Sequence, residues 1–310
     1  MEHETAGDPV SGCKWTRKTT QKIAQQLKRA GIRVSAKTVG RLLKEMNFSL
    51  RVNLKTLESG LSKPPDPIQR DLQFRYIRSQ ISTYRAQGMP VISVDTKSRE
   101  LMGPFHQSGR RWSHDPIKVF DHDFPSDCQG VAIPYGIYDL CRNEGFVCVG
   151  TTRDTSEFAV DAIRTWWVQA GSAHYPSADR LLILADCGGS NGYRTRLWKK
   201  QLHVAFCNRF GLQVKVCHYP PGSSKWNPIE HRMFSFISNN WAAQPLYGYE
   251  TVLKFIRTTK TSAGLKIRAA LNKKHYQKGI KVSDKQMEQI TLRRYTLRPN
   301  WNYSISPLEM

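Results

Sequence analysis

The sequence predicts a mixed α/β protein whose central sheet is covered by helices. Three short apolar runs, 91–95, 131–139 and 145–150, have the composition of strands. After residue 155, segments with helical periodicity alternate with further strand-like runs as far as residue 241. A group of strands followed by alternating helices and strands is typical of a mixed sheet with helices on its faces.

Residues 19–47 predict two short helices joined by a tight turn. Gly31 suits the end of the first helix, and Ser35 is a favourable N-cap for the second. The apolar positions on the two helical faces are Ile23, Leu27 and Ala30, then Val39, Leu42, Leu43 and Met46. The length of the turn fits a helix-turn-helix unit.

Polar and basic side chains cover the outer face of the second predicted helix. They are Lys37, Thr38, Arg41 and Lys44. A recognition helix presents such residues to the major groove or its phosphates, so these four are candidate DNA contacts. An ordinary amphipathic helical hairpin would show the same pattern, and that alternative stays open.

The remaining elements complete a four-part organisation. A linker is predicted at 58–67, and a helix with an apolar stripe follows at 68–87. Later helices and strands are predicted at 155–170, 180–186, 191–207, 212–217 and 226–241. The expected parts are a helix-turn-helix segment at 1–57, a linker and connecting helix at 58–90, a core at 91–245 and a basic region at 246–310.

The charge of the chain favours a polyanionic partner. The 47 Lys and Arg residues exceed the 25 Asp and Glu residues, which gives a formal net charge of +22. The excess lies mainly in the flanks, with +8 over residues 1–63 and +10 over residues 251–310. Nucleic acid is the usual partner of such a surface, although a solvated basic surface is the alternative.

Other classes of protein are disfavoured by the composition. No apolar run approaches the ~20 residues of a membrane span, and the start of the chain lacks the apolar segment of a secretory signal. The seven Cys residues contain no CxxC pair, so a zinc site is not expected. We expect a cytoplasmic protein, associated with the nucleoid and not with a membrane.

Three acidic residues occupy positions that suit metal-dependent phosphoryl transfer. Asp95 and Asp186 each close an apolar run, and Glu230 begins a predicted helix. Strand ends are held rigidly, and carboxylate oxygens are preferred Mg²⁺ ligands. Two such ions can hold the attacking and leaving oxygens of a phosphoryl displacement, so these three acids are candidate catalytic and metal-binding residues.

Spacing alone leaves structural alternatives open. Asp186 precedes a Gly-rich turn, where an acid is often only a turn residue. Asp139 also closes a strand-like run, and the loop that carries Asp121, Asp123 and Asp127 could bind a cation or simply be solvated.

The loop before Glu230 adds candidate contacts to DNA. Lys225 and His231 could contact the scissile or a flanking phosphate, and Asn227 is a further candidate that could instead cap the helix. An exposed lysine and a structural histidine are the alternatives for Lys225 and His231.

Taken together, these segments resemble the DDE transposases of bacterial insertion sequences, and in particular the Rhodopirellula-type transposase family. The resemblance covers about 14–307. Its matching segments are 91–97, 131–140, 157–160, 185–186, 188–193, 220–240 and 278–284. The Asn-Pro-Ile-Glu segment at 227–230 is also similar to the third-acid motif of mariner-like transposases.

The resemblance implies a ribonuclease H-like core that cleaves DNA at element ends and transfers the strand with Mg²⁺ or Mn²⁺, expected as two ions. Asp95, Asp186 and Glu230 match the acidic triad of the family. The implied partners are double-stranded DNA and further copies of the chain, in a homodimer or a larger synaptic assembly.

The chain departs from the family pattern at two places. Family members usually extend further upstream than the short leader before Thr19, so a shortened DNA-binding segment is expected, and Cys187 stands where the family tends to have glycine. Two alternatives to a transposase therefore remain: an inactive relative that represses by binding DNA, and a ribonuclease H-like nuclease.

Overall fold

The computed structural model describes residues 6–7, 14–15, 18–49 and 67–308, which fall into two compact units. The first unit is Met1–Lys55 and the second is Thr56–Met310. Most of the predicted linker, 58–66, lies outside the described residues. Each unit is therefore considered by itself.

The first unit contains the two predicted helices. Two short strands, β1 (Ala6–Gly7) and β2 (Lys14–Trp15), pair antiparallel. Helices α1 (Thr20–Arg29) and α2 (Ala36–Glu45) follow, and they pack through the buried side chains of Ile23 and Val39.

The sequence signals at the helix ends have the predicted roles. The Ser35 side chain accepts a hydrogen bond from the backbone N–H of Thr38, as an N-cap does. Gly31 has φ +86° just beyond α1, and Ile32 N–H donates to Leu27 O over 2.8 Å. This left-handed turn closes the first helix, so both predicted helix ends are confirmed.

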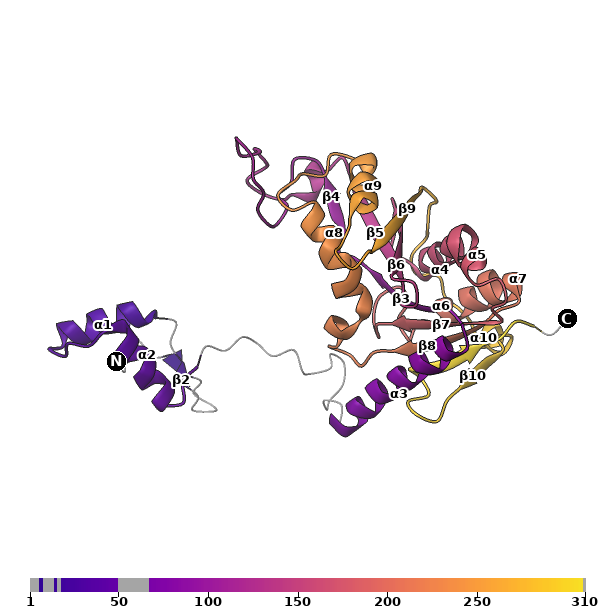
Figure 1. Cartoon of the computed structure of the whole chain (residues 1–310), viewed down its shortest axis with the longest axis horizontal. Coiled ribbons are helices and arrows are strands. Elements are labelled where there is room, and N and C mark those ends of the chain that lie inside the picture. Colours follow the sequence, from indigo (N-terminus) through magenta and orange to yellow (C-terminus); the bar gives the residue numbers. More distant parts are fainter. Residues whose placement is uncertain (1–5, 8–13, 16–17, 50–66, 309–310) are drawn as a thin grey trace. The chain divides into compact units, whose positions relative to one another are not determined.

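The second unit is built on one large mixed sheet (Figure 1). Its strands are β3 (Val91–Thr96), β4 (Glu100–Met102), β5 (Gly130–Asp139), β6 (Glu144–Gly150), β7 (Arg180–Ala185), β8 (Gln213–His218), β9 (Lys266–Asn272), β10 (Leu292–Arg294) and β11 (Asn302–Ile305). Their order is β10-β11-β8-β7-β3-β5-β6-β9, and β4 pairs with β5. Strands β3, β7 and β8 run parallel, whereas β5 is antiparallel to both β3 and β6.

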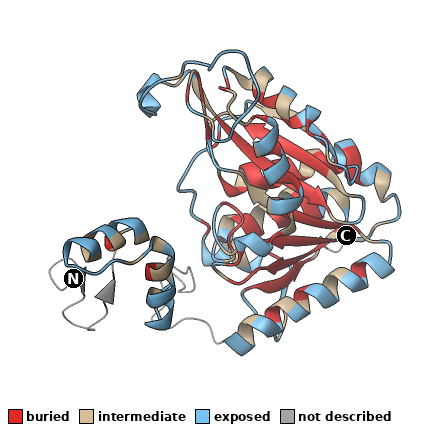
Figure 2. Cartoon of the chain, turned by 60° about the vertical axis from the view of Figure 1, so that its left-hand side comes forward, coloured by how far each residue is buried: buried red, intermediate tan, exposed pale blue. Residues whose placement is uncertain are grey.

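Helices cover both faces of this sheet. They are α3 (Pro67–Ala86), α4 (Ser156–Trp166), α5 (Ser172–His174), α6 (Arg196–Gln201), α7 (Asn208–Phe210), α8 (Ser235–Asn240), α9 (Tyr249–Thr258) and α10 (Asp284–Glu288). Helices α4 and α6 share the largest buried cluster with one face, while α3, α8 and α9 pack on the other. Strands β3, β5, β6, β7, β8 and β11 are accordingly buried along most of their length (Figure 2).

Several helices contain wider turns or begin later than predicted. π-Helical stretches occur at Trp167–Gly171, Leu202–Cys207 and Glu230–Phe234, and short 3₁₀ turns occur at Pro125–Asp127 and Ser224–Trp226. The helix predicted from 191 begins at Arg196, because residues 191–195 continue the Gly-rich turn after β7. The helix predicted from 226 begins at Pro228, and its π-helical part begins at Glu230.

The C-terminal residues are part of the same sheet. Strand β9 pairs parallel with β6 at one edge, and β11 pairs antiparallel with β8 near the other. Residues 246–310 are therefore not the separate basic region that the sequence predicted, since their apolar side chains, such as Tyr303 and Ile305, join the core. In the part of the chain that the structure describes, no helix has the length and apolar character needed to span a membrane.

Candidate active site

Two of the three predicted acids lie at adjacent strand ends. Strands β3 and β7 are parallel neighbours, and Val94 is in register with Ala185. The residues that follow are Asp95 and Asp186, so the sheet places both carboxylates at the same edge. Asp139 pairs with Ile92, near the opposite end of β3, and is therefore not part of this cluster.

Glu230 comes close to Asp95 because the residue that faces Asp95 on the neighbouring strand is a glycine, which has no side chain. Gly136 is the direct partner of Asp95 on β5. A Cβ atom at Gly136 would lie 2.6 Å from the Phe234 ring and 2.7 Å from the Met233 methyl group. Glycine thus lets the helix that carries Glu230 pack directly on the sheet beside Asp95.

Polar contacts fix the start of this helix to β3. The buried Ser93 hydroxyl donates to Asn227 Oδ1 and accepts from Ile229 N–H over 3.2 Å. Asn227 Nδ2 donates to Asp186 Oδ1 over 3.2 Å and to Val94 O over 3.4 Å. Asn227 is fully buried, so its prediction as a DNA contact is wrong: its amide joins the three segments that carry the acids.

The three carboxylates interact electrostatically. Burial, the neighbouring Asp186 charge and Glu230 hold the pKa of Asp95 well above its usual value. Burial raises the pKa of Asp186 to about 6, with Glu230 adding to the shift and the Asn227 hydrogen bond opposing it. Like charges gathered in a partly buried place favour proton uptake or cation binding.

This donor set has the chemistry that a divalent metal requires. Carboxylate oxygens are the preferred ligands of Mg²⁺ and Mn²⁺, and a cation would offset both the burial and the repulsion that raise the two pKa values. Among the described residues, however, no three His, Cys, Asp or Glu side chains already stand in a metal-ligand arrangement. Asp95, Asp186 and Glu230 would therefore have to adjust their side chains to share an ion.

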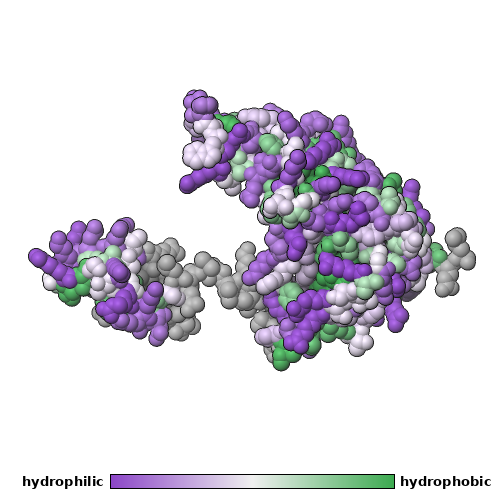
Figure 3. Space-filling view, viewed as in Figure 1, coloured by the Kyte–Doolittle hydropathy of each residue, from purple (hydrophilic) through white to green (hydrophobic). Residues whose placement is uncertain are grey.

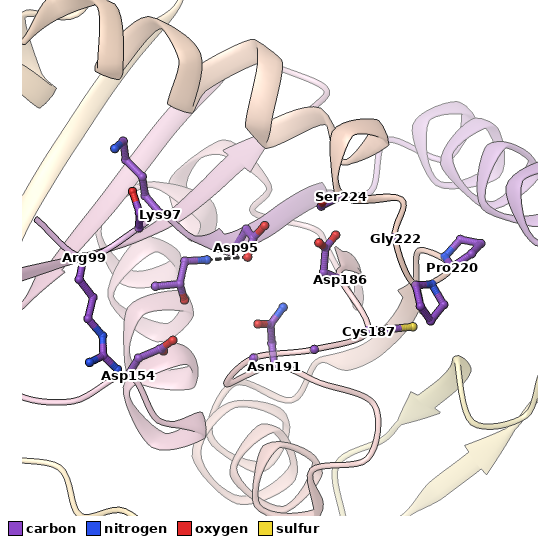
Figure 4. A pocket seen from close by; sticks show the side chains of 15 residues that line it. Asp95, Lys97, Arg99, Asp154, Asp186, Cys187, Asn191, Pro220, Gly222 and Ser224 are labelled. Atoms are coloured by element: carbon purple, nitrogen blue, oxygen red, sulfur yellow. Dashed lines mark hydrogen bonds between the residues drawn. The ribbon is translucent and has the colours of Figure 1, made fainter. Parts of the chain in front are cut away.

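A pocket of about 470 Å³ opens over Asp95 and Asp186, and we call it the carboxylate pocket. Its remaining lining is Thr96, Lys97, Ser98, Arg99, Asp154, Cys187, Gly188, Gly189, Asn191, Pro220, Pro221, Gly222 and Ser224. In Figure 4 the carboxylates of Asp95 and Asp186 lie side by side, and Arg99 lies with Asp154 at another part of the wall. The pocket therefore combines a site for cations with basic groups that suit an anionic substrate.

A buried hydrogen-bond chain supports Asp186 from the C-terminal strand. His218 Nδ1 lies 2.8 Å from Asp186 O, and His218 Nε2 lies 3.1 Å from the Tyr303 hydroxyl. Trp198 Nε1 donates to the same hydroxyl over 3.0 Å. A carbonyl oxygen can only accept, so Nδ1 carries the proton and Nε2 accepts from Tyr303. Burial lowers the pKa of His218 to about 4, which keeps the ring neutral.

The other predicted DNA contacts remain accessible. Lys225 and His231 are exposed beside the Glu230 segment. In the first unit Lys37, Arg41 and Lys44 are exposed, and Arg41 pairs with Glu45 over 2.6 Å. Thr38 is half-buried, and its hydroxyl lies 2.9 Å from Ser35 Oγ, so it contributes to the helix cap. Hydrophilic side chains dominate the visible faces of the chain (Figure 3).

Sequence reasoning did not identify four residues of this region: Asp154, Asn191, His218 and Tyr303. Asn191 lies in the Gly-rich turn after Asp186, and that turn was a usable signal. Tyr303 carries no such signal, because only the pairing of β11 with β8 brings it to His218.

The fold and the acids define a ribonuclease H-like core. The central strands follow the order β6-β5-β3-β7-β8, with Asp95 near the end of β3, Asp186 directly after β7 and Glu230 in the first turn of a helix. The chain belongs to the family described as the Rhodopirellula transposase DDE domain, whose model matches residues 1–307. No curated protein is similar enough in sequence to be matched to the chain.

Several solved structures of Mos1 transposase are similar to this chain. The paired-end complex with the left transposon end has a TM-score of 0.46 at 15% identity, over 77% of this chain and 65% of the Mos1 chain. The mariner Mos1 paired-end complex with Mg gives 0.46 at 16% identity, with the same coverage of both chains. The pre-cleavage Mos1 transpososome gives 0.45 at 15% identity, over 77% and 66%. The chain thus spans about 65% of the length of these Mos1 chains.

Proposed function

We propose that the protein is a DNA transposase that cleaves DNA at the ends of an insertion sequence and transfers the strand to a target. The observation that carries this proposal is the convergence of Asp95, Asp186 and Glu230 from three separate elements of a transposase-family fold. The raised pKa values of both carboxyl groups support a functional site at this place.

Asp95, Asp186 and Glu230 are the residues that would hold the divalent metal, proposed as two Mg²⁺ or Mn²⁺ ions. Bound metal would supply charge neutralisation at the phosphate and activation of the attacking oxygen. Asp95 is proposed as the shared ligand, since the charges of both Asp186 and Glu230 act on it. Asn227 would keep Asp186 oriented through its 3.2 Å hydrogen bond.

The basic side chains would bring DNA to these acids. Lys97 and Arg99 line the carboxylate pocket, and Lys225 and His231 are exposed near Glu230. Each could contact a phosphate of the bound strand. The outer face of α2, with Lys37, Arg41 and Lys44, would recognise the terminal repeat. Recognition of two ends would require a dimer or a larger assembly.

The reaction consists of two in-line displacements at phosphorus. Water first forms a new P–O bond at the element end, and the 3′ oxygen leaves and takes up a proton. That 3′-OH then forms a P–O bond with target DNA, and a target oxygen leaves. The Ser and Tyr residues of the chain are not needed as nucleophiles in this scheme, because the enzyme forms no covalent bond to DNA.

The test uses as substrate the DNA on either side of the gene, in which inverted repeats are identified first. We expect the purified chain with Mn²⁺ or Mg²⁺ to release 3′-OH ends. Asp95→Asn, Asp186→Asn and Glu230→Gln should each lower this cleavage by at least about 1,000-fold. Asp139→Asn is the matched control, because Asp139 is also an aspartate at a strand end and is buried, but it accepts its hydrogen bonds from Tyr175, Cys141 and Arg142.

The outcomes separate the alternatives. Metal-dependent cutting that is lost only in the three triad variants supports the transposase. Binding of the repeats without cutting would instead support a repressor. Cleavage of RNA–DNA hybrids without any requirement for the repeats would support a ribonuclease H-like nuclease.

A further inference from the structure

We propose that Asn191 is a substrate-binding residue whose side-chain amide donates to a non-bridging phosphate oxygen of the DNA strand in the carboxylate pocket. The inference rests on the proposed function, since DNA is the substrate in question. It assigns the recognition of a phosphate to a residue outside the acidic triad.

The first observation is a buried donor without an acceptor. Asn191 lines the pocket but is only 1% exposed, and its Nδ2 atom has no hydrogen-bond partner. Asn227 offers a direct contrast, because its amide bonds to Val94 O and Asp186 Oδ1. A buried amide N–H group without an acceptor is costly and marks a place where a ligand or ordered water binds.

The second observation is that the loop holds Asn191 in one direction. Gly189 has φ +74°, and Gly192 N–H donates to Gly189 O over 3.2 Å. A Cβ atom at Gly192 would lie 3.0 Å from Cys187 O, so the turn has no room to widen. The loop is also tied to α4, where the Ser156 hydroxyl donates to Ser190 O over 2.5 Å.

This loop turns the amide nitrogen toward the pocket. Asn191 Oδ1 lies on the side of the Gly189 turn, 3.7 Å from where a Cβ atom of residue 189 would stand. The amide nitrogen therefore points away from Gly189. In Figure 4 the end of the Asn191 side chain points into the pocket, on the side where Asp95 and Asp186 lie.

The surroundings select a phosphate oxygen as the acceptor. The Asp186 carboxylate has room to accept a second hydrogen bond, yet Asn191 Nδ2 donates none to it, so the amide is left for a ligand. Arg99, which is exposed, and Lys97, which is paired with Glu100, line the same pocket, and Arg99 in particular would attract an anionic strand. A phosphate that lies between these cations and the acids would bring a non-bridging oxygen to the Asn191 amide, which is a donor of fixed position.

The test combines a variant series with a direct signal from the amide. We expect Asn191→Asp, which has the same shape but repels phosphate, to lower cleavage of the flanking-repeat duplex by about 10- to 100-fold. Asn208→Asp makes the same charge change on an exposed residue remote from the pocket and should leave cleavage unchanged. Asn191→Ser provides a smaller variant if the aspartate version unfolds.

The direct signal is the side-chain ¹H–¹⁵N resonance of Asn191 in the unaltered chain, assigned by its absence in the variants. Addition of the duplex with Ca²⁺ should shift it, and this shift supports the inference whether or not cleavage follows. An unmoved resonance at saturating DNA, or equal cleavage by Asn191→Asp, would mean that the amide binds only water and would overturn the inference. Failure of the unaltered chain to cut would count against the proposed function alone.

Discussion

His218 Nδ1 lies 2.8 Å from the main-chain oxygen of Asp186, so the last residue of β8 holds the backbone of an acid that follows β7. The ring is itself held by Tyr303 of β11, which the far C-terminal segment supplies. The position of Asp186 thus depends on residues more than a hundred positions away. The C-terminal strand β11 therefore supports the candidate active site as well as the core.

Tyr303→Phe tests this support. The change removes the hydroxyl that donates to His218 and accepts from Trp198, while the ring still fills the core. We expect a loss of about 1–2 kcal/mol of stability. We also expect roughly 10-fold weaker binding of Mn²⁺, because groups that orient a ligand residue tune metal affinity. Calorimetric titration with Mn²⁺ measures this, and unchanged affinity would show that Tyr303 only stabilises the fold.

Gly136→Ala tests the close approach of the Glu230 helix to β5. The added methyl group would overlap Phe234 and Met233. We expect about 1–3 kcal/mol of destabilisation and a marked loss of cleavage, because Glu230 would be displaced from Asp95. Gly248→Ser is the control, since a Cβ atom there meets no atom within 4 Å. Denaturant unfolding and cleavage assays follow both effects. If Gly136→Ala has the stability and the cleavage rate of the unaltered protein, this contact does not position the helix.

The raised pKa of Asp186 predicts a pH dependence of stability without metal. The folded pKa is about 6, against a usual value of 3.8. Between these values the folded chain binds more protons than the unfolded chain, so stability falls as pH rises from about 4 to 6. The raised pKa of Asp95 continues this fall at higher pH.

Asp186→Asn removes the charge and should stabilise the metal-free protein by about 2 kcal/mol at pH 8. Melting curves recorded in EDTA across this pH range measure the effect. Addition of Mn²⁺ should reverse the ranking, because only the unaltered protein gains the full stabilisation by bound metal. If the melting temperature of Asp186→Asn in EDTA is equal to or below that of the unaltered protein, the proposed repulsion among the carboxylates is contradicted.

Lys37→Ala and Lys44→Ala test the role of α2. Both side chains are exposed on one helix and are proposed to contact phosphate. Each substitution should weaken binding of the terminal repeats and reduce the slope of log affinity against log salt concentration by about 1. Fluorescence anisotropy at several salt concentrations measures this. An unchanged slope would indicate that α2 does not face DNA.

The sequence predicted the parts of the fold that local pattern controls. The apolar runs before Asp95 and Asp186 become adjacent parallel strands, and Ser35 caps α2 as expected. Hydrophobic periodicity and helix caps involve residues that are close together in the sequence, so both can be recognised from one sequence alone. The resemblance to the transposase family is confirmed by the match over residues 1–307.

The missed features all depend on distant residues. Asn227 looked like a surface residue because its loop is polar, yet Ser93 and Asp186 bind it in the interior. The basic composition of 246–310 concealed β9, where only Ile267 is buried, and β11, where all four residues are buried. Tertiary contacts of this kind leave little trace in local periodicity.

The most direct test of the central claim is binding of Mn²⁺, followed by electron paramagnetic resonance of the free ion. We predict that the unaltered chain binds Mn²⁺ and that Asp95→Asn, Asp186→Asn and Glu230→Gln each weaken binding by at least about 10-fold, whereas Asp139→Asn does not. Affinity for Mn²⁺ that is unchanged in any of the three triad variants would contradict a metal site shared by Asp95, Asp186 and Glu230.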